Sequence, residues 1–268
     1  MITKTSDSGY EQIKNFLDKF QLELDRLIDE QPIGIYLHGS LAMGGFNPKS
    51  NDIDLIIVIE KPLSAKTKRD LARLFLAYSN EPYPIEASIL SIPQLENWQF
   101  PTPYEFHYSE DWRKKYEKEL KEGTSVYLNE DEKKDSDLAA HFTILRHRAL
   151  CFNGKPIQQV FPAVPPADYL SSILGDYEDC LKNFLLNPVY CLLNSIRVYW
   201  YLKDGVICSK QEAGNWGAAA LPGDYQKVIN QAVYAYENEK MKPAFIENDL
   251  MEIRDYLKWN IEELLAAR

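Results

Sequence analysis

The sequence predicts two domains of different class, an α/β (α+β) domain at the N-terminus and an all-α helical bundle domain at the C-terminus. Three short apolar runs of strand length fall within residues 1–95. From residue 136 onward, apolar residues recur almost throughout at the spacing of amphipathic helices. Prolines and a glycine interrupt the pattern near residues 153–166, so we place the two domains at 1–155 and 156–268.

The N-terminal region alternates between helical and strand patterns. Apolar residues at helical spacing predict helices at residues 9–30 and 64–78. Short apolar runs predict buried strands at residues 33–38, 53–59 and 84–90. Residues 92–130 are rich in proline, aromatic and charged residues, and we expect loops and short helices there. Later helices are predicted at residues 136–151, 167–185, 189–203, 209–220, 223–238 and 245–266.

The charge of the chain restricts the ligands that it can bind. The chain has 268 residues and a formal net charge of −10, and acidic residues outnumber basic ones in both halves. We therefore expect no nucleic-acid partner, because nucleic acids are bound through clustered lysine and arginine side chains. An acidic protein attracts cationic ligands, although acidity also serves solubility alone.

The sequence also lacks the segments that would direct it to or through a membrane. The apolar run at residues 55–59 has the length of a strand and is far too short to cross a bilayer. The first residues lack the apolar core of a signal peptide, so we expect a cytoplasmic protein with no membrane partner. The four cysteines form no C-x-x-C motif, and we expect reduced, mostly buried thiols.

A glycine–serine turn and a pair of aspartates form the most informative motif. Gly39 and Ser40 follow the first predicted strand, where small residues let backbone N–H groups approach a phosphate and Ser40 can add a hydroxyl donor. Asp52 and Asp54 open the second strand at positions i and i+2, so both carboxylates project from one face. Two such carboxylates can share magnesium ions, which prefer oxygen ligands.

Glu86 on the third predicted strand would complete this group. A lone carboxylate among apolar strand residues is costly unless it is paired, hydrogen-bonded or bound to metal. Taken singly, a Gly-Ser turn and an Asp-x-Asp pair are common structural features. Their combination with an acid on the next strand indicates a metal-dependent site for displacement at phosphorus. His38, just before the turn, is expected either to be structural or to line the phosphate site.

This arrangement resembles the nucleotidyltransferase superfamily related to DNA polymerase β. More closely, the chain resembles the aminoglycoside nucleotidyltransferases that adenylylate streptomycin and spectinomycin. The resemblance spans residues 30–240. Besides the motif above, it is carried by residues 84–89 and 105–112, by 137–139 with Arg146 and Arg148, and by 194–200 with Gly205, Ser209, Lys210, Trp216, Leu221 and Pro222.

The resemblance implies a magnesium-dependent enzyme that transfers AMP from ATP to a hydroxyl of a small cationic acceptor. An aminoglycoside-type antibiotic is the implied acceptor, with streptomycin or spectinomycin as first choice, and pyrophosphate is the second product. The residues implied to bind the nucleotide are Gly39, Ser40, Asn51, Arg197 and Lys210. The residues implied to be catalytic and to hold two magnesium ions are Asp52, Asp54 and Glu86, with Glu86 as the base that deprotonates the acceptor.

The sequence departs from the family pattern at two places. One extra residue separates Ser40 from Asp52, so that Asn51 rather than Ser50 precedes the aspartate pair. The acidic helix opening that helps the family to bind the cationic drug is replaced at residues 187–190 by Asn-Pro-Val-Tyr. Two alternatives remain open: the same transfer to another small molecule, a protein or an RNA, and a non-catalytic nucleotide-binding protein on this fold.

Overall fold

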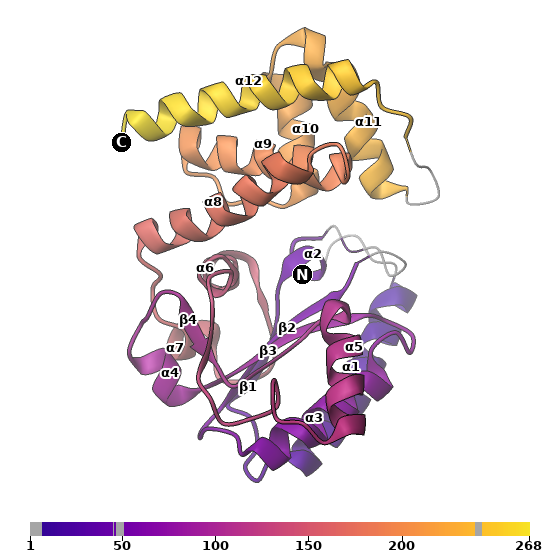
Figure 1. The fold of residues 1–268 in the computed structure, drawn as a ribbon, viewed down its shortest axis with the longest axis vertical. Helices are drawn as coiled ribbons and strands as arrows, with labels where there is room; N and C mark the ends of the chain where they lie inside the picture. Colours follow the sequence, from indigo (N-terminus) through magenta and orange to yellow (C-terminus); the bar gives the residue numbers. More distant parts are fainter. Residues whose placement is uncertain (1–6, 45, 47–50, 239–242) are drawn as a thin grey trace. The chain divides into compact units, whose positions relative to one another are not determined.

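The computed structural model describes residues 7–44, 46, 51–238 and 243–268, and the chain forms two compact units. The first unit comprises residues 1–168 and the second residues 169–268. Unit 1 contains a five-stranded sheet with helices on both faces, and the described part of unit 2 is helical (Figure 1). The predicted fold class, α/β followed by all-α, is thus confirmed.

The sheet of unit 1 has the strand order β5-β3-β2-β1-β7. Its strands are β1 (Gly34–Leu37), β2 (Ile53–Ile59), β3 (Ile85–Ser91), β5 (Phe106–Tyr108) and β7 (Leu150–Gly154). Only β2 and β3 pair in parallel, and the other neighbours are antiparallel. A parallel pair needs a long crossover connection, and α3 (Ala65–Tyr78) provides it between β2 and β3.

Helices cover both faces of this sheet (Figure 1). One face packs against α1 (Asp7–Leu27), α3 and α5 (Glu110–Glu122), and it buries Leu55 and Ile57 of β2 in the main core. The opposite face packs against α4 (Ile92–Glu96), α6 (Leu138–Arg148) and α7 (Ile157–Val160), and it buries Ile56 and Val58. Because β2 is buried on both faces, it reads as a continuous apolar run. The smaller elements of unit 1 are α2 (Gly39–Ala42), β4 (Thr102–Tyr104) and β6 (Lys133–Asp135).

Both edge strands of the sheet fall outside the predicted strands. β5 lies in the region expected to hold loops and short helices, next to the 13-residue helix α5. The helix predicted over 136–151 is wrong at its end, because α6 ends at Arg148 and β7 begins at Leu150. β5 and β7 have only three and five residues, so their apolar alternation is too short to give a clear strand signal.

Unit 2 is built around α9 (Pro188–Asp204). Residues 191–196 of this helix are all buried, and α10 (Lys210–Ala220), α11 (Gln226–Glu237) and α12 (Glu247–Ala266) all pack against it. A Cβ atom on Gly214 of α10 would lie 2.7 Å from Leu193 Cδ2, so the glycine permits close packing of α10 on α9. The remaining elements are α8 (Pro166–Asn183), which belongs to unit 2 from Tyr169 onward, and a short 3₁₀ helix at Gly223–Tyr225.

Within the described ranges, every helix is too short or too polar to cross a bilayer. All four cysteines lie in these ranges, and none forms a disulfide. Cys151 on the edge strand β7 is exposed, whereas Cys180, Cys191 and Cys208 are buried.

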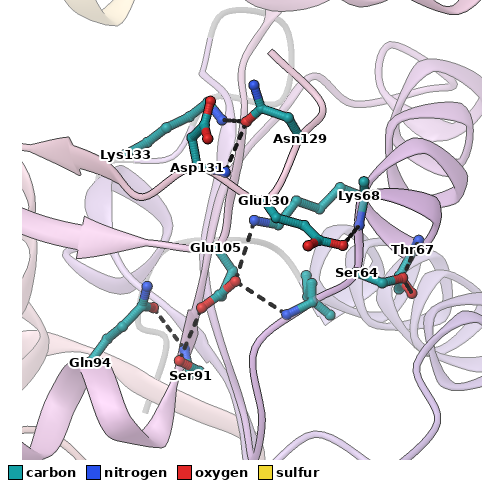
Figure 2. A network of polar contacts seen from close by, with 12 residues as sticks. Ser64, Thr67, Lys68, Ser91, Gln94, Glu105, Asn129, Glu130, Asp131 and Lys133 are labelled. Atoms are coloured by element: carbon teal, nitrogen blue, oxygen red, sulfur yellow. Dashed lines mark hydrogen bonds and ion pairs between the residues drawn. The ribbon is translucent and has the colours of Figure 1, made fainter. Parts of the chain in front are cut away.

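A buried ion pair connects the ends of β2 and β3 to α3 (Figure 2). Lys68 Nζ lies 3.4 Å from Glu105 Oε2, and the two side chains are only 4% and 7% exposed. Glu105 also accepts hydrogen bonds from the Ser91 hydroxyl at 3.1 Å and from the Leu63 backbone N–H at 3.2 Å. A buried charge is tolerated when it is paired and hydrogen-bonded, and Glu105 meets both conditions.

We expect Glu105→Gln to lower the free energy of unfolding by about 3 to 5 kcal/mol, because it leaves the buried Lys68 ammonium without its compensating charge. Urea denaturation measures this loss. The matched control is Asp18→Asn, which breaks an exposed pair with Lys14 whose side chains are 45% and 46% exposed. That control should cost at most about 1 kcal/mol. A loss from Glu105→Gln no larger than that of the control would contradict a structural role for the buried pair.

Candidate functional site

Two acidic residues lie side by side where β2 and β3 begin. The parallel register pairs Asp54 with Glu86, directly after the pair of Ile53 and Ile85. Side chains alternate between the faces of a strand. Ile53 and Ile85 are buried in the main core, so the two carboxyl groups project from the opposite face. Both are half-buried, and neighbouring strands are only about 4.8 Å apart.

The Gly39–Ser40 turn lies directly against Asp54. The backbone N–H of His38 donates to the Asp54 carbonyl oxygen at 3.1 Å, which fixes the end of β1 to the start of β2. Gly39 has φ +58°, and a Cβ atom there would lie 1.7 Å from Asp54 Oδ2. The carboxylate therefore occupies the space that any other side chain at position 39 would fill. Position 39 requires glycine both for its positive φ angle and for this lack of space.

The hydroxyl of Ser40 has no hydrogen-bond partner among the residues that the structure describes. Its Oγ is also buried. A buried polar atom without a partner costs free energy, so such an atom needs an explanation. Ser40 directly follows Gly39, whose Cβ position is occupied by the Asp54 carboxylate.

The remaining residues of the motif lie just before β2. Asp52 and Asn51 are half-buried, and Asp52 precedes Asp54 by two positions. The structure thus brings Gly39, Asp54 and Glu86 together around one end of the β2–β3 pair. Residues 45 and 47–50 of the connecting segment, including Ser50, lie outside the described residues.

The protein groups fit a cation that is shared with a bound phosphate chain. No group of three or more His, Cys, Asp or Glu side chains in the described residues is arranged to hold a metal ion by itself. Magnesium, however, is usually held by one or two carboxylates together with substrate phosphates and water. The Asp54 carboxylate seated on Gly39 fits that requirement.

Histidines group on the same face of the sheet, which the sequence did not predict. The rings of His38 and His141 are 4.8 Å apart between centroids, and His107 Nδ1 lies 3.0 Å from the Ser88 hydroxyl. Burial lowers the pKa of His38 well below its ordinary value, and nearby His141 lowers it further. Burial also lowers the pKa of His107, although the negative charge of Glu86 opposes this shift. Both imidazoles are therefore neutral at neutral pH and supply no positive charge to the acidic pair.

The grouping of the histidines could be found only from strand register. Ser88 follows Glu86 by two residues on the same face of β3, and it pairs with His107 across β5. Nothing in the sequence spacing of positions 38, 107 and 141 indicates that the three residues meet, because they come from a strand end, an edge strand and a helix.

The two predicted cations of unit 2 belong to neighbouring helices of that unit. Arg197 lies on α9, and its Nη1 donates to Asn194 Oδ1 at 3.2 Å. Lys210 is the first residue of α10, and its Nζ lies 4.3 Å from the centroid of the Tyr190 ring. Both cations are half-buried, and each is held by a polar or aromatic residue of α9.

Two family models match most of the chain. A nucleotidyltransferase domain matches residues 17–128, and the C-terminal domain of aminoglycoside adenylyltransferase matches residues 159–259. The chain is 26% identical to spectinomycin 9-adenylyltransferase of Campylobacter jejuni, over 91% of this chain and 93% of that protein. It is 25% identical to an aminoglycoside (3'') (9) adenylyltransferase of Escherichia coli, over 91% and 92%.

A solved structure has the same fold. The spectinomycin adenyltransferase AAD(9) of Enterococcus faecalis, crystallised with ATP and spectinomycin, superposes with a TM-score of 0.76. The match covers 94% of this chain and 99% of that protein, at 23% sequence identity.

Gly39→Ala tests the contact between the turn and Asp54. We expect it to lower the free energy of unfolding by about 1 to 3 kcal/mol more than Gly44→Ala does. The two glycines have similar φ angles of +58° and +78°, but among the described residues a Cβ at Gly44 meets no atom within 4 Å. Gly44→Ala therefore carries the backbone strain without the collision. Equal losses in urea denaturation would show that Asp54 does not lie against the turn.

Proposed function

The chain belongs to the aminoglycoside adenylyltransferases, a family of nucleotidyltransferase enzymes, and we propose that it transfers AMP from ATP to a hydroxyl of an aminoglycoside-type antibiotic and releases pyrophosphate. The in-register pairing of Asp54 with Glu86 against the Gly39 turn carries this proposal. Spectinomycin and streptomycin are the first acceptors to test. The names of the relatives from Campylobacter jejuni and Escherichia coli support this choice.

In the proposed reaction, the acceptor oxygen attacks the α-phosphorus of ATP. A new O–P bond forms, the bond from the α-phosphorus to the bridging oxygen breaks, and pyrophosphate leaves with that electron pair. Glu86 takes the hydroxyl proton, because an alcohol is a poor nucleophile while it keeps its proton. The position of Glu86 directly beside Asp54 supports this role.

We propose that the triphosphate binds at the turn through Gly39 and Ser40, with Asn51 close by in the sequence. The buried and unsatisfied Ser40 hydroxyl is the main support for this part of the site. Arg197 and Lys210 of the helical unit are proposed to bind the phosphates as well. Their positively charged guanidinium and ammonium groups can donate charge-assisted hydrogen bonds to phosphate oxygens.

Asp52, Asp54 and Glu86 are the proposed ligands of two magnesium ions. When bound, such ions neutralise triphosphate charge and stabilise the attacking and leaving oxygens. The Asp54 carboxylate seated on Gly39 is held in place by backbone packing, which supports its role as an ion ligand.

We further propose that residues 1–155 form the nucleotidyltransferase domain and residues 156–268 the helical domain that binds substrate and nucleotide. The ranges of the two family matches, 17–128 and 159–259, support this division. A cationic acceptor suits the net charge of −10, which also disfavours nucleic acid. The proposed location is the cytoplasm, where ATP is available and thiols stay reduced.

Purified protein with ATP and magnesium should release pyrophosphate when spectinomycin or streptomycin is added. The measurement is a panel assay of pyrophosphate release across aminoglycosides and other small alcohols, with mass spectrometry of the adenylylated product. Activity with another alcohol alone would replace the acceptor and keep the chemistry. Failure to bind ATP and to use any acceptor would favour a non-catalytic protein.

Glu86→Gln should reduce turnover by about 10²- to 10⁴-fold, because glutamine keeps the size of the side chain but cannot take the proton. The affinity for magnesium–ATP should stay within about threefold of wild type, since Asp52 and Asp54 remain as ion ligands and the base acts mainly on the acceptor. Asp54→Asn should weaken both turnover and magnesium-dependent ATP binding. Calorimetry and single-turnover kinetics measure the two effects separately.

The control for charge removal is Glu96→Gln, at an exposed position in α4 of the same unit. It should leave both quantities unchanged. If Glu86→Gln keeps near-normal turnover when chemistry limits the rate, Glu86 is not the base. If it loses ATP binding as severely as Asp54→Asn, Glu86 acts mainly as an ion ligand.

A further inference from the structure

Three side chains of α9 form a stripe, and two of them contact one carboxylate of α8. Tyr190, Asn194 and Arg197 lie at positions i, i+4 and i+7, which share one face of a helix. Asp176 accepts a hydrogen bond from the Tyr190 hydroxyl, which lies 3.0 Å from both carboxylate oxygens. It accepts a second hydrogen bond from Asn194 Nδ2 at 2.7 Å. All four residues belong to unit 2.

Asn194 and Tyr190, the two donors to Asp176, each also contact a cationic side chain. The Asn194 amide is buried, and because its NH₂ group donates to Asp176, its oxygen is turned toward Arg197 and accepts from Nη1 at 3.2 Å. The Tyr190 ring, anchored by its hydroxyl, supports Lys210 Nζ at 4.3 Å from its centroid, which is cation–π geometry. One carboxylate therefore connects to both cations, through an amide on one side and an aromatic ring on the other.

We propose that Asp176 is a positioning residue that orients Arg197 and Lys210, and that it thereby sets the affinity of the protein for the ATP triphosphate. This inference rests on the proposed function, in which the two cations bind the phosphates. Arginine and lysine side chains have many rotamers, and holding them in place before the ligand arrives reduces the entropy lost on binding. The carboxylate acts through Asn194 and Tyr190 and needs no contact with ATP.

The protonation of Tyr190 fits this role. Burial raises the pKa of its hydroxyl, and the nearby Asp176 carboxylate raises it further. The hydroxyl therefore remains a donor to Asp176 at every pH at which the protein would be assayed. The network needs no titrating group in order to keep its geometry.

The first test replaces Asp176 by asparagine in the full-length protein and measures the Kd of magnesium–ATP by calorimetry. Loss of charge-assisted hydrogen bonds to two anchors should raise this Kd by about five- to tenfold. The matched control is Asp179→Asn on the same helix, where the aspartate side chain is 71% exposed and pairs only locally with Lys182. The control should leave the Kd unchanged. An unchanged Kd in Asp176→Asn, with folding intact by circular dichroism, would overturn the proposal.

A double-mutant cycle separates positioning from a general structural effect. In the background of Arg197→Ala with Lys210→Ala, Asp176→Asn should cause no further loss of ATP affinity, because the side chains that it orients are absent. A full additional loss would overturn the proposal. If the Arg197→Ala, Lys210→Ala protein binds ATP like wild type, the proposed function of these cations fails and the inference fails with it. If that protein binds weakly but Asp176→Asn binds normally, the inference alone fails.

Two further measurements complete the test. Tyr190→Phe keeps the ring under Lys210 and removes only the hydroxyl that reaches Asp176. It should raise the ATP Kd by about threefold, and it serves if Asp176→Asn does not fold. An unchanged Kd in this folded variant would then overturn the proposal. Asp176 is only half-buried, so a cationic acceptor could contact its carboxylate directly. The KM for spectinomycin is therefore measured in parallel. A raised acceptor KM with an unchanged ATP Kd would assign the carboxylate to the acceptor and overturn the positioning role.

Discussion

Parallel pairing of β2 with β3 places Asp54 beside Glu86, and the rest of the candidate site is built around this pair. The register is fixed by the opposite face of the same strands, where Ile53, Leu55 and Ile85 are buried in the main core. A slip of one residue would turn these side chains toward the wrong face. The cost of exposing them therefore maintains the alignment of the two carboxyl groups. The turn at Gly39 depends on the same alignment, because it packs on the Asp54 carboxylate.

Local patterns were sufficient to predict the parts of the fold with a strong hydrophobic signal. The strand predicted over 53–59 is confirmed as β2, and the helix predicted over 64–78 is found at Ala65–Tyr78. These elements bury a whole face or a full stripe of apolar residues, so their periodicity is strong. β5 and β7 could not be read in this way, because three and five residues are too few for their alternation to be told from a loop or a helix end. The sequence therefore supports the central layer of the sheet better than its edges.

The same limit applies to the candidate site. The spacing of Asp52 and Asp54 is local and could be read directly, whereas the pairing of Asp54 with Glu86 needs the crossover through α3. The roles of these residues stay predictions. The stripe of Tyr190, Asn194 and Arg197 follows helical periodicity, but its partner Asp176 lies on the preceding helix. The sequence departs from the family pattern at residues 187–190. In the structure, the Tyr190 hydroxyl donates a hydrogen bond to the Asp176 carboxylate of α8. An acid is thus present near this helix opening, although it is engaged with α9.

The framework of unit 1 and its candidate site differ in whether their buried polar groups have hydrogen-bond partners. At the ends of β2 and β3, Glu105 satisfies Lys68 by an ion pair and accepts two further hydrogen bonds, so this network is complete within the protein. At the starts of the same strands, the Ser40 hydroxyl is buried without a partner among the described residues. An orphaned atom alone does not define a site, because the Tyr177 hydroxyl in the helical unit is orphaned as well. Ser40 differs because its neighbour Gly39 holds a carboxylate whose strand partner is a second acid. Internal contacts complete the network at one end of the strands, whereas at the other end the Ser40 hydroxyl keeps no partner among the described residues.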